Sequence, residues 1–274
     1  MADAPYTFAL DAYLARIGYA GPREPTLAVL RELHRLHPQA IPFENLTPLM
    51  GGMVSLAPED ILAKLVAGGR GGYCYEQNGL FQTALEALSF NVTGLAARVR
   101  WGAPDDAPLR PRTHMLLRVE LPEGPYLADV GFGGLVLTTP LRFEPHRAQD
   151  TPHERFRLAP LEDGFLELQA EIGDGWRALY RFDLTPHIAA DYEPLNWFSG
   201  SHPASPFTFT LSVARTLPEG RLTLGNRRFV RRQAGQAPAE RMIDSFEELT
   251  AVLSGDFGIR LPDGIEAIRG KLGL

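Results

Sequence analysis

The spacing of apolar residues divides the chain into parts of different character. Up to about residue 90, apolar residues recur three or four positions apart, as they do between residues 10 and 17, and this spacing is typical of amphipathic helices. Between residues 92 and 182, short runs rich in β-branched and aromatic residues alternate with turn signals such as Pro-Glu-Gly-Pro at 122–125. The pattern predicts helices first and then an antiparallel sheet or small barrel.

The last third of the chain has a mixed pattern. It begins with a Pro- and Ser-rich stretch at 196–206, which we expect to be a connection. Strand-like runs follow at 207–213, 221–224 and 227–231, and Ser245 is placed to cap a helix that continues to about residue 253. Helices and strands are segregated along the chain, which indicates the α+β class.

Composition narrows the classes of function. The chain has 274 residues, of which 45% are apolar and 22% are charged, and this is ordinary for a globular protein. The net charge of −6 argues against a nucleic-acid partner. Two loose groups of arginines, at 100–118 and 227–232, are expected to be solvated faces or edge strands. The alternative for them is a landing patch for a phosphorylated small molecule.

The sequence gives no sign of a membrane or secreted protein. No apolar run approaches the ~20 residues that a membrane helix needs, and the segment 1–7 lacks the basic and apolar regions of a signal peptide. Cys74 is the only cysteine, so the chain can form neither an internal disulfide nor a multi-cysteine zinc site, and we expect no metal. We therefore expect a cytoplasmic protein, in which a lone thiol stays reduced.

The stretch from Arg70 to Asn78 is the most informative part of the sequence. Gly71-Gly72 lets the backbone turn tightly and approach another molecule closely. Helical spacing resumes just after Cys74, which places its sulfur near a helix N-terminus, where free N–H groups and the positive end of the helix dipole favour a thiolate. A buried structural cysteine is the alternative, but the glycine pair and the helix start favour a nucleophile.

A nucleophilic thiol needs a base that a third group holds in place. Of the seven histidines we single out His114, at the start of an expected strand, because the other six lie in helix-face or turn-like polar contexts. Asp129 lies on the next expected strand, where a carboxylate among apolar residues is costly unless it is paired. We therefore expect His114 to pair with Asp129. The alternative for His114 is a core histidine that bonds to the backbone.

Register arithmetic supports this pairing. A hairpin loop with an even number of residues gives facing positions whose numbers add to an odd total, and 114 and 129 add to 243, so both side chains lie on one face. A turn at Pro122-Glu123 gives a facing total of 245 and makes the two residues diagonal neighbours. A turn at Glu123-Gly124 gives 247 and spreads them further apart. The sequence is compatible with both turns.

A glycine-rich segment, Val130-Gly131-Phe132-Gly133-Gly134, follows Asp129 directly. Its glycines allow a ligand to approach the backbone closely, although a simple turn would need the same residues. The segment is not a dinucleotide-binding fingerprint, because it does not open a helix.

Several motifs taken together resemble the arylamine N-acetyltransferase family, and they span the whole chain. In the family's order they are Ile41-Pro42-Phe43-Glu44-Asn45-Leu46, Arg70-Gly71-Gly72-Tyr73-Cys74, Thr113-His114, Asp129-Val130-Gly131-Phe132-Gly133, Asn196-Trp197-Phe198-Ser199 and Ser205-Pro206-Phe207. The number and the order of these motifs make coincidence an inadequate explanation.

The resemblance implies an architecture and a reaction. The fold would comprise a helical domain at 1–90 that carries the cysteine, an antiparallel β-barrel domain at 91–195 that carries the histidine and the aspartate, and a connection with an α/β lid domain at 196–274. The reaction would be the ping-pong transfer of an acetyl group from acetyl-coenzyme A through an acetyl-cysteine intermediate. Its acceptors would be arylamines, arylhydrazines or arylhydroxylamines.

The resemblance also implies roles for single residues. Cys74, His114 and Asp129 match the family's cysteine-protease-like catalytic triad. The positions similar to the family's acceptor-pocket lining are Phe43, Val99, Phe132 and Phe207. The positions that look close to the pantetheine arm of coenzyme A are Thr113, Gly131 and Gly133. The expected partners are small-molecule acceptors and coenzyme A, without nucleic acid or membrane, and a homodimer is compatible with the sequence.

Two other functions fit parts of the pattern. A cysteine hydrolase or transglutaminase-like enzyme would use the same triad, and its acyl-enzyme would hydrolyse as fast as it transfers. A binding module would leave Cys74 inert, and the thiol would then react slowly with iodoacetamide at neutral pH.

Overall fold

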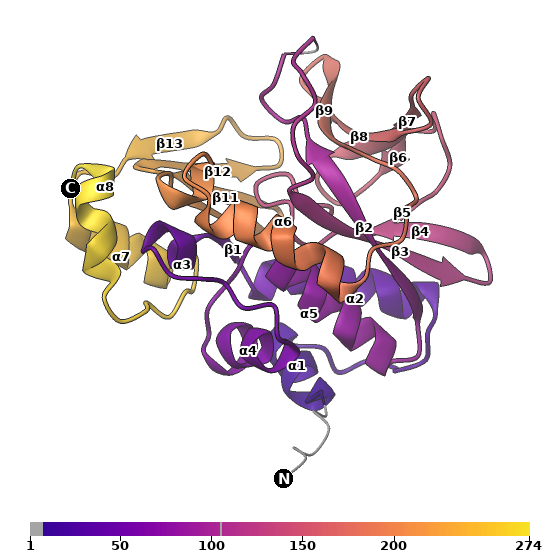
Figure 1. The fold of residues 1–274 in the computed structure, drawn as a ribbon, viewed down its shortest axis with the longest axis horizontal. Helices are drawn as coiled ribbons and strands as arrows, with labels where there is room; N and C mark the ends of the chain where they lie inside the picture. The colour runs from indigo at the N-terminus through magenta and orange to yellow at the C-terminus, as the bar shows by residue number, and fades with distance from the viewer. Residues whose placement is uncertain (1–7, 105) are drawn as a thin grey trace.

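The computed structural model describes residues 8–104 and 106–274, and its elements follow the order that the apolar spacing predicts (Figure 1). The segment 1–7, where we expect no signal peptide, lies outside the described residues. Within the described part of the chain, no helix combines the length and the apolar character needed to cross a membrane.

The first ninety residues are mainly helical. Thr26 begins one helix by accepting a hydrogen bond from the N–H of Val29, and Pro58 begins another at the position where its missing N–H costs nothing. Their apolar faces share one core, in which Leu30 and Phe81 are completely buried. The helical elements of this part are α1 (Leu10–Ile17), α2 (Leu27–Ala40), α3 (Leu46–Leu49), α4 (Pro58–Leu62), a π-helical turn (Ala63–Ala67) and α5 (Cys74–Ala87).

The middle of the chain forms an eight-stranded antiparallel sheet that curls into a nearly closed barrel, as predicted. The strands lie in the order β5-β4-β3-β2-β9-β8-β7-β6. Apolar side chains fill the interior, and Phe156 and Phe182 are completely buried there. The strands are β2 (Asn91–Val99), β3 (His114–Leu121), β4 (Gly124–Ala128), β5 (Leu141–Arg142), β6 (Gln149–Asp150), β7 (Arg155–Pro160), β8 (Leu166–Ile172) and β9 (Gly175–Phe182).

The hairpin between β3 and β4 has one of the two predicted registers. Leu121 faces Gly124 and Leu117 faces Ala128, so facing residue numbers add to 245. The turn therefore lies at Pro122-Glu123, which confirms that alternative and makes positions 114 and 129 diagonal neighbours.

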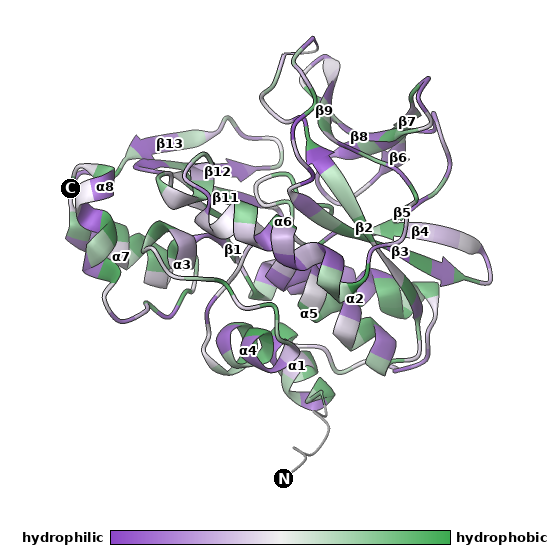
Figure 2. Cartoon of the chain, in the orientation of Figure 1, coloured by the Kyte–Doolittle hydropathy of each residue, from purple (hydrophilic) through white to green (hydrophobic). Residues whose placement is uncertain are grey.

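The last part contains a second sheet with a small helical layer. A short strand from the N-terminal part, β1 (Phe43–Glu44), pairs with β10. This sheet therefore connects the N-terminal helical part with the last part of the chain (Figure 1). All residues of the edge strand β13 are exposed, and Figure 2 shows it in both hydrophilic and hydrophobic colours. The remaining elements are β10 (Ser212–Leu217), β11 (Gly220–Gly225), β12 (Arg228–Gln233), β13 (Ala239–Met242), α7 (Phe246–Gly255), a 3₁₀ turn (Ile265–Ile268) and α8 (Arg269–Leu272).

The predicted connection at 196–206 is wrong in its first half, because α6 (Ala189–Ser201) continues through it. Asn196 is buried, and its amide donates a hydrogen bond to the Val54 carbonyl at 2.9 Å and accepts one from the Tyr73 hydroxyl. These tertiary contacts outweigh the weak helix propensity of asparagine, serine and glycine. Pro206 then opens a short 3₁₀ turn (Pro206–Thr208).

Candidate active site

Cys74 is the first residue of α5, where the chain turns tightly into the helix. A side chain at Gly71 would collide with the Pro42 carbonyl, so glycine is needed for this close approach. The Glu76 carboxylate accepts a hydrogen bond from the Tyr73 N–H at 3.1 Å and caps the helix start. The N–H of Cys74 has no partner within the helix at this first position, so it is available to a ligand.

The structure brings the three residues singled out from the sequence together. His114 opens β3, and its Nε2 atom lies 2.7 Å from Oδ2 of Asp129, which follows β4. The Cys74 thiol lies close enough to the same imidazole to help raise its pKa, and since Nε2 faces the carboxylate, Nδ1 is the nitrogen left for the sulfur. Cys74 Sγ also lies 3.5 Å from the Thr113 carbonyl oxygen.

The Asp129 carboxylate is completely buried, and each of its oxygens accepts two hydrogen bonds. Oδ1 accepts from the Asn78 amide at 3.0 Å and from the Gly131 N–H at 2.9 Å. Oδ2 faces His114 and accepts from the Tyr180 hydroxyl at 2.9 Å. Four donors match the capacity of a carboxylate, so the charge is held in one orientation without water.

The electrostatics of the pair favour a charged imidazole beside a charged carboxylate. Burial acts to lower the pKa of His114, but the Asp129 charge and the hydrogen bonds to Asp129 and Cys74 outweigh it and raise that pKa to about 10. Burial acts to raise the pKa of Asp129, but the charge and hydrogen bond of His114 and the N–H donors of Asn78 and Gly131 lower it.

Two further histidines lie directly behind the site, although we expected them in polar helix-face contexts. His34 and His37 of α2 are completely buried, and this corrects the expectation. The Asp129 N–H donates to His34 Nε2 at 3.1 Å, and His37 Nε2 lies 2.7 Å from the Gln77 amide oxygen. Burial lowers the pKa of His34 to about 3 and that of His37 to about 4, so both are neutral.

Aromatic side chains surround the site. The Phe132 ring lies 5.2 Å from the rings of both His114 and Tyr180. The Phe43 and Phe207 rings lie 6.1 Å apart, and the backbone of β1 meets the glycine pair before α5. Three of the four residues proposed for an acceptor pocket therefore lie on aromatic clusters near the cysteine.

The remaining residues from the sequence analysis lie nearby. Val99 is half-buried on β2. A Cβ atom at Gly131 would lie 2.8 Å from the Cys74 Cα atom, so this glycine packs directly on the start of α5. Gly133 has a φ of 81°, which favours glycine, and a Cβ atom there would lie 3.5 Å from the Phe43 ring.

Asn78 and Tyr180 complete the site, and our sequence reasoning did not single them out. Asn78 lies one turn after Cys74 on α5, so helical spacing could have indicated that it faces the same way. No local signal relates Tyr180 to Asp129, because β9 reaches the site by pairing with β2. Within residues 8–104 and 106–274, no group of three or more His, Cys, Asp or Glu side chains is arranged to hold a metal ion.

Comparison with known proteins relates this geometry to a family. A family model described as N-acetyltransferase matches residues 26–265. Arylamine N-acetyltransferases of Mycobacterium tuberculosis H37Rv and Escherichia coli K12 are 43% and 41% identical to the chain, over 93% of its length and 90% of theirs. The structure of Mycobacterium marinum arylamine N-acetyltransferase in complex with CoA superposes with a TM-score of 0.92 at 40% identity, over 96% of this chain and 98% of the other. Similarity of this extent shows that the chain belongs to the arylamine N-acetyltransferase family.

Proposed function

We propose that this protein transfers an acetyl group from acetyl-coenzyme A to arylamines, arylhydrazines or arylhydroxylamines. The observation that carries the proposal is the buried His114–Asp129 pair, 2.7 Å apart, with the buried Cys74 thiol beside the imidazole at the start of α5. The names of the relatives support it, since one structural relative was solved with CoA and a Salmonella typhimurium relative is also named an N-hydroxyarylamine O-acetyltransferase.

In the first half-reaction, the Cys74 sulfur attacks the carbonyl carbon of the acetyl thioester. A bond forms between that carbon and Cys74, the bond to the coenzyme A sulfur breaks, and coenzyme A leaves with the proton that His114 carried. We assign stabilisation of the oxyanion to the Cys74 N–H, because this group has no partner within the helix at the first position of α5. Asp129 holds the imidazole in the required tautomer and stabilises its positive charge.

In the second half-reaction, the acceptor nitrogen attacks the acetyl carbon on Cys74. His114 takes a proton from the acceptor, the bond to the Cys74 sulfur breaks, and the acetylated acceptor leaves. The enzyme returns to its starting charges, because the thiolate and the imidazolium are both restored. Cys74 as a residue is only 3% exposed, which limits competition by water.

The surrounding residues would then select the two substrates. The residues proposed to contact the acceptor ring are Phe43, Val99, Phe132 and Phe207. The residues proposed to lie along the pantetheine arm are Thr113, Gly131 and Gly133. The glycines suit this role because a side chain at Gly131 would collide with the Cys74 backbone, and one at Gly133 would lie against the Phe43 ring.

Steady-state kinetics tests the proposal. Initial rates are measured while acetyl-coenzyme A is varied at several fixed concentrations of an arylamine or a hydrazine. We expect parallel lines in double-reciprocal plots, with coenzyme A competing against the acceptor as a product inhibitor, because one site serves both substrates in turn. Intersecting lines, with no coenzyme A released before the acceptor is added, would establish direct transfer and contradict the covalent route.

The cysteine hydrolase alternative is separated by omitting the acceptor. A transferase then releases about one equivalent of coenzyme A and stops, because the acetyl group stays on Cys74. A hydrolase continues to consume acetyl-coenzyme A at its full rate.

A further inference from the structure

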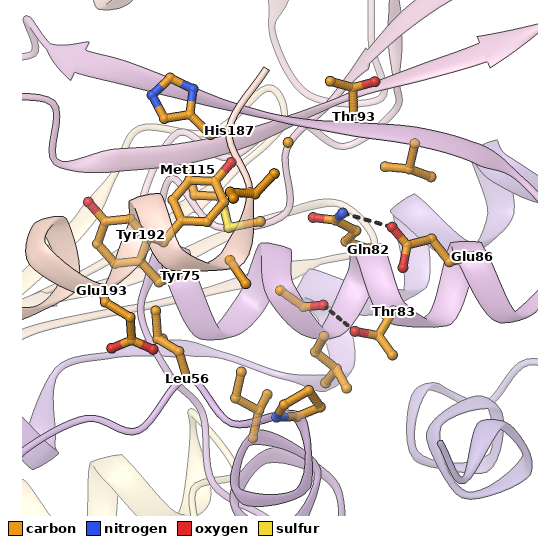
Figure 3. A pocket seen from close by; sticks show the side chains of 18 of the residues that line it. Leu56, Tyr75, Gln82, Thr83, Glu86, Thr93, Met115, His187, Tyr192 and Glu193 are labelled. Carbon is orange, nitrogen blue, oxygen red and sulfur yellow. Dashed lines mark hydrogen bonds between the residues drawn. The ribbon is translucent and has the colours of Figure 1, made fainter. Parts of the chain in front are cut away.

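A cavity of about 500 Å³ lies beside the active site, and Cys74 does not line it (Figure 3). Its walls come from α4, α5, the start of β2 and the segment that opens α6. The lining positions on α5 are 75, 79, 80, 82, 83 and 86, whose spacing places them on one side of the helix. Cys74 lies about 100° around the helix from position 75. The cavity and the thiol therefore use different faces of the same helix.

The inner wall of the cavity is apolar and aromatic. Leu80 and Met115 are buried there, and Val92 is partly buried. The Tyr75 and Tyr192 rings, whose centroids lie 5.9 Å apart, form a wall toward α6 (Figure 3). The volume lies within the usual range for small-molecule sites, which combine such walls with a few polar groups.

The charged part of the lining is acidic. Glu86 and Glu193 lie at the rim, and no lysine or arginine is among the described residues that line the cavity. Glu86 accepts a hydrogen bond from the Gln82 amide at 2.8 Å. Neither carboxylate takes part in an ion pair within the described part of the chain. The Nδ1 atom of His187 donates to a backbone carbonyl at 2.9 Å, so it is already engaged.

We propose that this cavity binds a hydrophobic organic cation. Its ammonium group lies at the end of the cavity that Tyr75 and Tyr192 form, beside Glu193, and its apolar body extends along the aliphatic wall toward Glu86 (Figure 3). The faces of aromatic rings attract such cations, and among the described residues no lysine or arginine lines the cavity to compete for Glu193. An anion of the same shape would meet two like charges. The site lies apart from the acyl-transfer chemistry and does not rest on the proposed function.

Isothermal titration calorimetry with three ligands of similar shape tests the proposal at pH 8, where an ordinary histidine is neutral. The cation is 3-phenylpropyltrimethylammonium, which has no N–H and so cannot be acetylated. The neutral and anionic ligands are 3-phenylpropanol and 3-phenylpropionate. We expect the cation to bind about fivefold or more tightly than the alcohol, and the carboxylate to bind most weakly. Equal affinities, or no detectable binding of the cation, would overturn the proposal.

Variants locate the bound cation. Glu193→Gln should weaken its binding about twofold to fivefold, and Glu86→Gln, at the other end of the cavity, should weaken it less. Both positions are exposed, so folding is not at risk. Thr83→Phe should abolish binding by filling the cavity, whereas Ala87→Phe adds the same ring to α5 outside the lining and should leave binding intact. Cys74→Ala should bind the cation normally. Unchanged affinity in Glu193→Gln, or loss of binding in a folded Cys74→Ala protein, would contradict this location.

Discussion

Asp129→Asn should disable the site through the geometry around the carboxylate. Asn78 and the Gly131 N–H face Oδ1 and can only donate there, so an asparagine amide group cannot settle on that side without a donor–donor conflict. On the Oδ2 side the Tyr180 hydroxyl can rotate to accept, and the His114 Nε2 atom can accept if it loses its hydrogen. The substitution therefore favours the tautomer with the hydrogen on Nδ1.

In that tautomer no basic nitrogen faces Cys74, so the imidazole cannot take the thiol proton and form the thiolate–imidazolium pair that attacks the thioester. The corresponding aspartate-to-asparagine change in a serine protease lowers turnover about 10⁴-fold for the same reason, which is about 5.5 kcal/mol of transition-state stabilisation. We expect a loss of this size in acetyl-enzyme formation by Asp129→Asn. The enzyme is mixed with acetyl-coenzyme A under single-turnover conditions, and the release of coenzyme A is recorded over time. The rate of this release is the rate of acetyl-enzyme formation.

A matched variant controls for nonspecific effects of the amide. Asp150→Asn makes the same change at an exposed carboxylate that pairs with Arg155 on the barrel surface, and it should acetylate at the parental rate. Circular dichroism checks that both variants are folded. A folded Asp129→Asn protein that acetylates within about tenfold of the parental rate would refute the reasoning, because the tautomer would then not depend on this carboxylate.

Three further predictions concern the surroundings of this carboxylate. Tyr180→Phe removes one hydrogen-bond donor to buried Asp129 and should lower the free energy of unfolding by about 1.5–3 kcal/mol. Urea denaturation measures this free energy, and an unchanged free energy of unfolding would exclude that hydrogen bond in solution. Because the pKa of His114 is raised from 6.5 to about 10, its contribution to stability is fully present below pH 6.5 and is lost as the pH rises through 10. The stability difference between the parent and His114→Gln should shrink over that window, and a constant difference would argue against the raised pKa. Gly131→Ala places a Cβ atom 2.7 Å from the Asn78 amide, so it should lower the free energy of unfolding by about 1–3 kcal/mol and also lower the acetylation rate. Gly225→Ala places its Cβ atom in open space and should change both quantities little. Equal effects of the two substitutions in unfolding and acetylation assays would contradict this packing argument.

Local patterns in the sequence predicted the features that depend on near neighbours. The helix start at Cys74 follows from apolar spacing and from the glycine pair before it. The diagonal relation of His114 and Asp129 follows from hairpin arithmetic once the turn lies at Pro122-Glu123. Both depend on contacts within about twenty residues, where geometry is set by the helix repeat and the pleat.

Contacts between segments that are distant in the sequence could not be predicted from local sequence patterns. The buried state of His34 depends on α2 packing against the segment that carries Asp129, and its position four residues after Leu30 was the only local hint. Asn196 became helical because of side-chain contacts with Val54 and Tyr73, which outweighed its poor propensity. The pairing of β1 with β10 joins residues about 170 positions apart, and no local pattern encodes such a partner.

The central claim is that Cys74 carries the acetyl group. Incubation with acetyl-coenzyme A and no acceptor, followed by intact-protein mass spectrometry, tests it directly. We expect an increase of about 42 Da that maps to Cys74 and disappears when an arylamine is added, as covalent catalysis requires. No mass increase in the parent protein, or the same increase in Cys74→Ala, would contradict the claim.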